Sequence, residues 1–212
     1  MLLALDTTGL FCSSAVLDGH SLIEASENIG RGHAEHLMAQ IEAVLLRADA
    51  QWPDIDRIAC CTGPGSFTGL RVGLATARGL ALALNCPCIG VTVFEAFAFA
   101  HAGSAPLCVA MDAKRDQIWL QCFADANRSL AEPCGITSAG ASEAVPERVA
   151  RFAGSAGEML ATKVSGAEVI DPSPSPPIAA IARLGAAART DLAPPKPLYL
   201  RAPDAKVQQA AR

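Results

Sequence analysis

Short apolar runs and longer amphipathic patterns alternate along the first hundred residues. Apolar runs bounded by turn signals predict strands over residues 2–6, 12–17 and 22–27, and Asp18-Gly19 is typical of a hairpin turn between the last two. Apolar residues then recur at spacings of three and four, which predicts a helix over residues 33–48. The chain therefore opens with a three-stranded meander that is followed by a helix.

The next elements alternate between strands and helices. Residues 57–62 read as a buried strand, and Gly63-Pro64-Gly65 ends it. Ser66 is a good N-cap for a helix that runs to Leu84. A strand over residues 88–91 and a helix over residues 94–101 follow. Hairpin strands followed by alternating helices and strands predict a mixed α/β layer.

The second half begins as the first half does. An apolar strand over residues 107–112 ends in Asp112 and a turn, and a second strand covers residues 117–123, as Leu2–Asp6 and its successor do. This self-similarity predicts two related lobes, residues 1–102 and a smaller lobe of residues 103–212. Further predictions are a proline-rich loop over residues 171–177, a frayed tail from residue 202, and helices over residues 141–150, 158–162 and 178–189.

Composition narrows the class of protein. Hydrophobic residues make up 51% of the 212 residues and charged residues 18%, which excludes a disordered chain. A net charge of −4 excludes a broadly basic groove, and an aromatic content of 5% is low for a protein that stacks nucleic-acid bases.

Membrane and thiol signals point to a cytoplasmic protein. The longest uncharged stretch, residues 79–94, contains Asn85 and Pro87 and is too short for a spanning helix, so no membrane contact is expected. None of the eight cysteines is in Cys-x-x-Cys spacing, and several lie in apolar runs. Buried, reduced thiols are expected, rather than a zinc site or a disulfide framework.

The loop over residues 63–69 has two interpretations. Backbone amides at a helix start, with the hydroxyls of Ser66 and Thr68, could hold an anion. The loop lacks the Gly-Lys-Ser/Thr sequence of a Walker A motif, because Leu70-Arg71 follows Gly69. The pattern favours the simpler interpretation, a capped helix whose glycines allow close packing.

The helix after this loop carries a row of small residues, namely Gly69, Gly73, Ala77 and Ala81. Such a row lets another element approach closely, and the helix is apolar almost all round, with two arginines as its only charges. The first helix carries a second apolar row, namely Ala39, Ala43, Leu46 and Ala50. An interface between chains and a core helix covered within one chain explain this pattern equally well.

Two polar clusters are weaker candidates. Asp6-Thr7-Thr8 could bind a phosphate or a metal, but an Asp that ends a strand and bonds its own turn is the more common arrangement. His33 and His36, with Glu35 between them, could share a helix face. Surface or capping roles are more common for such a pair than metal binding, and no catalytic triad or reactive cysteine is indicated.

Four segments together resemble the TsaB family, also called YeaZ or glycoprotease-like, of bacterial tRNA threonylcarbamoyladenosine biosynthesis proteins. They are LLALDTT (2–8), HAEHL (33–37), GPGSFTGLRVG (63–73) and YLR (199–201). The resemblance implies an actin-like ATPase (ASKHA) fold, with two ribonuclease-H-like lobes, mixed sheets and a reduced second lobe. That fold agrees with the repeated strand-Asp-turn-strand pattern.

The resemblance also implies a function. Proteins of this family are non-catalytic partners that bind and organise the catalytic subunit TsaD, which the ATPase TsaE joins. The complex makes N6-threonylcarbamoyladenosine (t6A) in tRNA, so tRNA contact is expected only through the complex. A homodimer is expected when the chain is alone. No cofactor of its own is expected, while the heterodimer junction is a candidate site for ATP or ADP.

The resemblance shifts the open choice toward an interface, since the family pairs through a bundle of first-lobe helices. The expected partner-binding residues are Leu37, Ile41, Gly69, Leu70, Arg71, Gly73, Leu74, Ala77 and Arg78. Asp6, Thr7 and Thr8 are a candidate vestigial phosphate site. No catalytic or metal residue is carried over, because TsaD-like subunits use His-x-x-x-His whereas His33 and His36 are three apart. The alternative is an enzyme acting alone, either a peptidase or a small actin-like kinase.

Overall fold

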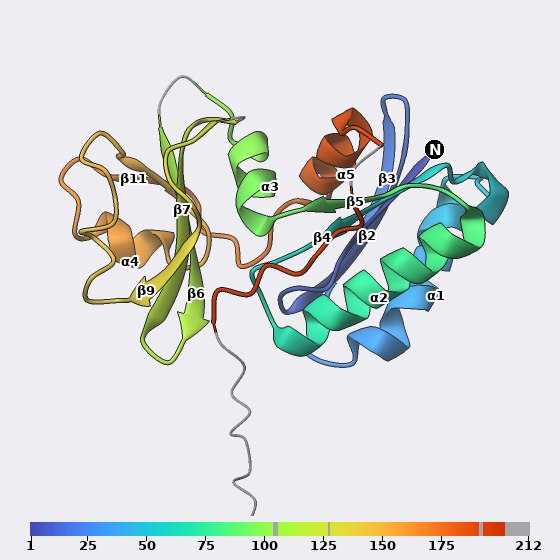
Figure 1. Ribbon diagram of the computed structural model, residues 1–212, viewed down its shortest axis with the longest axis horizontal. Helices are drawn as coiled ribbons and strands as arrows, with labels where there is room; N and C mark the ends of the chain where they lie inside the picture. Colours follow the sequence, from blue (N-terminus) through green and yellow to red (C-terminus); the bar gives the residue numbers. More distant parts are fainter. Residues whose placement is uncertain (104–105, 127, 191–192, 202–212) are drawn as a thin grey trace, which may run out of the picture.

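The structure is a computed structural model, and it describes residues 1–103, 106–126, 128–190 and 193–201. The chain forms two lobes, each built on one sheet (Figure 1). The predicted tail from residue 202 lies outside the described residues.

The first lobe is built on a five-stranded sheet in the order β3-β2-β1-β4-β5. Its strands are β1 (Leu2–Asp6), β2 (Phe11–Asp18), β3 (Ser21–Asn28), β4 (Arg57–Cys61) and β5 (Cys88–Val91). β1, β2 and β3 pair antiparallel, while β4 and β5 join parallel to β1. Every strand predicted for this lobe is confirmed to within a residue or two.

Helices cover both faces of the first sheet. The helices α1 (His33–Arg47) and α2 (Phe67–Leu84) pack on one face around a core that includes Leu3, Leu5 and Ile58, and a 3-10 turn covers Trp52–Asp54. The helices α3 (Val93–Ala100) and α5 (Ile178–Ala187) lie on the other side, in a cluster that reaches the second lobe (Figure 1).

The second lobe repeats the first in outline. Its sheet has the order β11-β10-β6-β7-β8, and β9 also pairs with β7. Its elements are β6 (Leu107–Lys114), β7 (Gln117–Asp125), β8 (Arg128–Ser129), β9 (Cys134–Thr137), β10 (Arg151–Ala153), α4 (Gly157–Ala161) and β11 (Glu168–Asp171). β6 has an antiparallel neighbour, β7, and a parallel neighbour, β10, as β1 has β2 and β4. The predicted two-lobed actin-like α/β fold is therefore confirmed.

Two expectations for the second half differ from the structure. The predicted helix over residues 141–150 is wrong: these residues form turns with i to i−3 hydrogen bonds, and Pro146 lacks the amide that an α-helix needs there. The predicted helix over residues 178–189 forms as α5, but it packs on the first sheet, against β1 and β4. The predicted boundary at residue 102 therefore places α5 in the second lobe, although α5 covers the sheet of the first lobe.

The last described residues form an extended segment between the two lobes. We call residues 193–201 the C-terminal strap; they have no regular secondary structure. The strap runs from the first lobe to the foot of β6 in the second lobe (Figure 1). Leu198 and Leu200 add side chains to the cluster that joins the lobes.

By length and composition alone, α2 could cross a membrane, and it is the one such helix among the residues described. Core helices of globular proteins meet the same criterion. One face of α2 packs on the first sheet through residues such as Leu74 and Ala77.

Candidate functional site

The loop at the start of α2 is tied to the turn after β1. Ser66 donates its backbone amide to the carbonyl of Thr8 at 2.7 Å, and its hydroxyl accepts from the amide of Gly69 at 3.3 Å. This confirms Ser66 as the N-cap of α2. Gly63 has φ +98°, a conformation that favours glycine, and it turns the chain from β4 into the loop.

Three glycines allow this close approach. A Cβ on Gly65 would overlap the carbonyl of Thr8, and one on Gly69 would overlap the carbonyl of Thr7. A Cβ on Gly73 would lie 2.5 Å from the hydroxyl of Thr7. The glycines therefore serve packing within the chain, as the simpler interpretation of the loop predicts.

The Asp6-Thr7-Thr8 turn uses its polar groups internally. Asp6 Oδ1 accepts from the amide of Thr8 at 2.9 Å and from its hydroxyl at 2.7 Å, and the hydroxyl of Thr7 donates to the carbonyl of Gly69 at 2.7 Å. These three donors are thus engaged by the chain itself, so they do not fit a phosphate. The predicted vestigial phosphate site gains no support from this geometry.

Asp6 itself is enclosed in the core. The residue is 1% exposed, and its Oδ2 has no hydrogen-bond partner among the described residues. Burial raises the pKa of Asp6, and the hydrogen bonds from Thr8 only partly oppose this effect. Asp6 therefore acts as a structural carboxyl that holds the β1 turn.

Most of the predicted partner-binding residues are covered by the chain's own first lobe. Those buried are Leu37, Ile41, Gly69, Leu70, Gly73, Leu74 and Ala77. The small-residue row of α2 faces Thr7 and the sheet, so a partner helix cannot use it in this conformation. Spacing identified a close contact correctly but could not identify the neighbour. Arg71 and Arg78 remain on the exposed side of α2.

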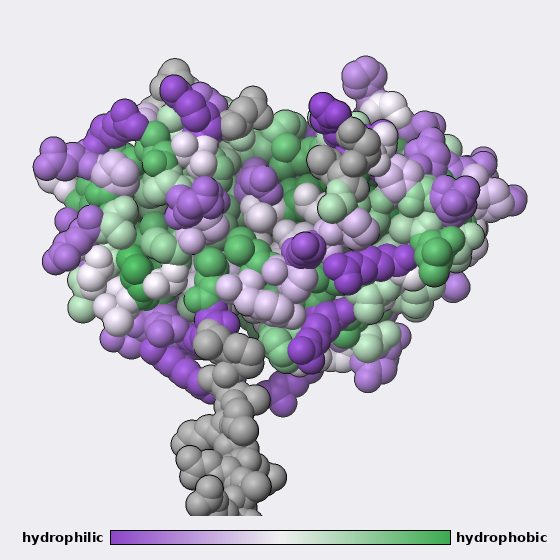
Figure 2. Space-filling model, viewed as in Figure 1, coloured by the Kyte–Doolittle hydropathy of each residue, from purple (hydrophilic) through white to green (hydrophobic). Residues whose placement is uncertain are grey.

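The opposite sides of these helices carry exposed apolar residues. We call this surface the outer helix face, and it comprises Ala39, Ala43 and Leu46 of α1 with Ala75, Gly79 and Leu82 of α2. Leu46 is 81% exposed and Leu82 is 84% exposed. Figure 2 shows apolar side chains gathered over the C-terminal end of α2, at the right of the view. The second row of α1 was recognised in the sequence, whereas the row on α2 was missed, although residues 75, 79 and 82 have helical spacing.

A cluster of two aromatic rings and an arginine lies at the other end of α2. The guanidinium of Arg71 lies 3.7 Å from the centre of the Phe67 ring. The Tyr199 ring of the C-terminal strap lies 5.4 Å from the Phe67 ring, between centroids. This arrangement brings two of the recognised segments, residues 63–73 and 199–201, together at one surface.

The two histidines of α1 do not converge. Nε2 of His33 lies 3.2 Å from the carbonyl oxygen of Phe11, while Nε2 of His36 lies 3.3 Å from a carboxylate oxygen of Glu27. Within the described part of the chain, no group of three or more His, Cys, Asp or Glu side chains is arranged to hold a metal.

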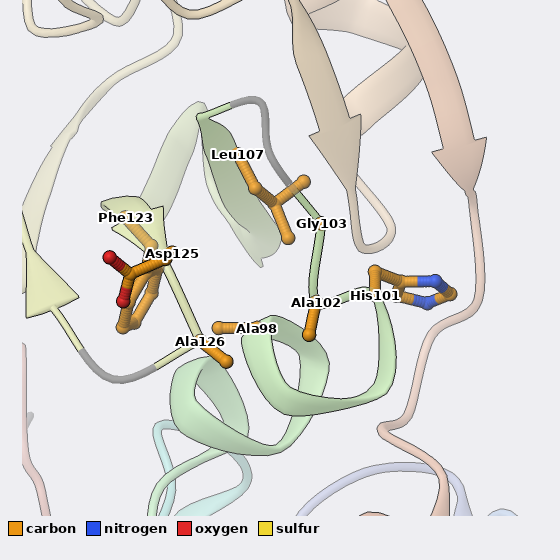
Figure 3. A pocket seen from close by; sticks show the side chains of 8 residues that line it. All are labelled: Ala98, His101, Ala102, Gly103, Leu107, Phe123, Asp125 and Ala126. Carbon is orange, nitrogen blue, oxygen red and sulfur yellow. The ribbon is translucent and has the colours of Figure 1, made fainter.

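A small hollow lies between the end of α3 and the β6–β7 pair (Figure 3). Its volume is about 10 Å³, room for one water molecule at most. His101 lies at its rim, and its Nε2 is 2.7 Å from Asp171 Oδ2. Burial disfavours ionisation of Asp171, but hydrogen bonds from Ser173 and His101 outweigh it and lower the pKa. The hollow is too small for a substrate.

Comparisons with known proteins agree with this architecture. The model of the family "TsaD: tRNA N6-adenosine threonylcarbamoyltransferase" matches residues 25–166. An uncharacterized protein of Mycobacterium tuberculosis is 30% identical over 96% of this chain and 93% of its own length. The tRNA threonylcarbamoyladenosine biosynthesis protein TsaB of Escherichia coli is 31% identical over 59% of this chain and 56% of its own length.

Two solved structures also match over most of the chain. An uncharacterized protein from Pseudomonas aeruginosa, described as similar to peptidase YeaZ, superposes with a TM-score of 0.77 at 26% identity, over 94% of this chain and 99% of its own. YeaZ from Pseudomonas aeruginosa superposes with a TM-score of 0.72 at 27% identity, over 87% of this chain and 90% of its own. The matched fold, the matched sequence and the recognised segments agree, and the chain therefore belongs to the TsaB/YeaZ family of tRNA threonylcarbamoyladenosine biosynthesis proteins.

Proposed function

We propose that this chain is a non-catalytic partner subunit in t6A synthesis, which binds and organises a TsaD-type catalytic subunit through its outer helix face. A TsaE-type ATPase would join the pair, and tRNA would be reached through the complex. The proposal rests on family membership for the pathway and on the outer helix face for the mode of action.

The exposed leucines carry the proposal. Leu46 and Leu82 are more than four-fifths exposed, and alanine and glycine residues surround them on two adjacent helices. Small residues beside large apolar ones let two helices of a partner pack closely, because the backbones can approach each other. Burying exposed apolar area stabilises an association by about 25 cal/mol per Å², before the entropic cost of binding is counted.

The turn after β1 supports a binding role over an independent kinase role. A kinase would need free donors for phosphate, whereas the three donors described above in the turn bond to the chain itself. The turn thereby fixes the start of α2 against the first sheet. A rigid α2 suits docking, because less conformational entropy is lost on binding.

Pairing of purified proteins tests the proposal. Leu82→Glu and Leu46→Glu place charge on the outer helix face, and both side chains are exposed, so the fold should persist. Met159→Glu is the matched control, since Met159 is a partly exposed apolar residue on α4 in the second lobe. Calorimetric titration into a TsaD-type subunit should show binding weakened at least about tenfold for both leucine variants, and unchanged for Met159→Glu.

Wild-type affinity in both folded leucine variants would contradict the proposed surface. A nucleotide at the junction of the two subunits stays a prediction. Adding ADP to the same titration checks it, with tighter pairing as the expected result.

A further inference from the structure

The C-terminal strap is attached to the first lobe at two points. The amide of Leu198 donates to the carbonyl of Thr62, beyond the end of β4, at 2.8 Å. The guanidinium of Arg78 on α2 donates to the carbonyl of Pro195. Pro195 is buried against Gly90 of β5, where a Cβ would lie 2.8 Å from the proline ring. The strap is therefore held beside the start and the middle of α2.

Arg201 attaches the strap to the second lobe. Its guanidinium donates to the carbonyls of Ala113 and Lys114 at 2.9 and 3.1 Å and to Gln117 Oε1 at 2.7 Å. It also lies 5.9 Å from the Trp119 ring centre. All four contacts belong to the β6–β7 hairpin, so one side chain links the strap to the strand pair that opens the second lobe.

Tyr199 lies between these two attachments. Tyr199 is 44% exposed, and its ring rests beside Phe67, which is 43% exposed and lies under Arg71. The Arg71–Phe67–Tyr199 cluster is continuous with the exposed side of α2, because Arg71, Ala75 and Leu82 follow one another at helical spacing. Exposed aromatic rings beside an arginine are the residue types that dominate binding energy at protein interfaces.

We infer that the partner-docking surface extends from α2 onto the C-terminal strap, with Tyr199 as a contact residue and Arg201 as the residue that positions it. This inference rests on the proposed function. The surface is then composite: α2 supplies Phe67 and Arg71, and the second lobe holds Tyr199 in place through Arg201. Docking therefore requires the arrangement of the two lobes, and binding in turn stabilises that arrangement, since linkage is reciprocal.

The physical reason is the entropy that is lost when the strap is ordered on binding. Without Arg201 the strap loses its hydrogen bonds to the second lobe, and its end gains backbone freedom. A partner would then have to order Tyr199 as it binds, and that cost appears as lower affinity. A role limited to fold stability would leave the affinity of the folded protein unchanged.

Two variants and one control test the inference. Tyr199→Ala removes the contact, Arg201→Ala removes the anchor, and Arg128→Ala removes a solvent-exposed arginine of the same lobe that pairs with Asp125 at 3.5 Å. The readouts are hydrogen exchange at the Leu198 amide in the free protein and affinity for a TsaD-type subunit. We expect Tyr199→Ala to weaken binding about tenfold. Arg201→Ala should speed exchange and weaken binding severalfold, and Arg128→Ala should change neither.

The outcomes separate this inference from the proposed function. If Leu82→Glu weakens pairing but Tyr199→Ala binds like wild type, Tyr199 is no contact and the inference fails while the proposed function stands. Either of two results for Arg201→Ala refutes the positioning role of Arg201. One is faster hydrogen exchange together with wild-type affinity, and the other is hydrogen exchange at the wild-type rate. Wild-type affinity in all variants, Leu82→Glu included, removes the outer helix face as the docking surface, and no binding of the wild-type chain to a TsaD-type subunit removes the proposed function itself.

Discussion

A single methyl group placed at two points of α2 should change stability in opposite directions. Gly69 faces the turn after β1, and a Cβ there would overlap the backbone carbonyl of Thr7. Gly79 lies on the same helix, and a Cβ there meets nothing within 4 Å. Gly69→Ala and Gly79→Ala are therefore the same chemical change on one helix in two environments.

The magnitudes follow from the contacts. Replacing glycine by alanine inside a helix stabilises it by about 1 kcal/mol. At Gly69 this gain is offset by overpacking, which costs about 1–3 kcal/mol. Displacing Thr7 would also weaken its 2.7 Å hydrogen bond to the Gly69 carbonyl, a loss of about 1 kcal/mol. We expect Gly69→Ala to lower the free energy of unfolding by about 1–3 kcal/mol and Gly79→Ala to raise it by about 0.5–1 kcal/mol.

Urea denaturation followed by circular dichroism measures both values, and thermal melting gives a second reading. In a chain of this size each kcal/mol shifts Tm by about 2–4 °C. Stabilisation of similar size in both variants would refute the reasoning, because it would mean that the α2–turn contact has room for a methyl group.

Three further changes test other contacts. Ser66→Ala removes the N-cap acceptor of α2 and should cost about 1 kcal/mol of stability in urea titrations; no change would refute the cap. Arg57→Ala removes a guanidinium that donates to three carbonyls at the end of α5. The change should speed proteolytic cleavage at the end of α5, and an unchanged rate of cleavage would contradict this expectation. The lowered pKa of Asp171 stabilises the fold above pH about 3.8, and this stability is lost as the pH falls through the pKa of the folded state. Asp171→Asn should therefore make the free energy of unfolding fall less steeply at acid pH, and an unaltered acid limb of the stability–pH curve would argue against this.

Much of the first lobe was predictable because its elements are locally determined. The apolar run before Asp6, the Asp18-Gly19 turn and the Ser66 cap each specify their own conformation, and the structure has all three. The second lobe was harder to predict, since strands as short as Arg128–Ser129 leave no periodic signal.

The candidate site was predicted only in part, for a different reason. Spacing shows that a helix has two apolar sides, but it does not show which side the sheet covers. Gly69, Gly73 and Ala77 proved to be the inner side, and Leu82 the outer side. A local pattern cannot predict the contact between Arg78 and Pro195, because these residues are 117 positions apart in the sequence.

Reconstituted tRNA modification tests the central claim most directly. A TsaD-type subunit, a TsaE-type ATPase, tRNA and threonylcarbamoyl adenylate would be combined with and without this chain, and t6A would be measured by mass spectrometry of tRNA nucleosides. We predict t6A only when this chain and the TsaD-type subunit are both present, and none with this chain as the sole subunit. Equal t6A formation with and without this chain would contradict its role as the organising partner.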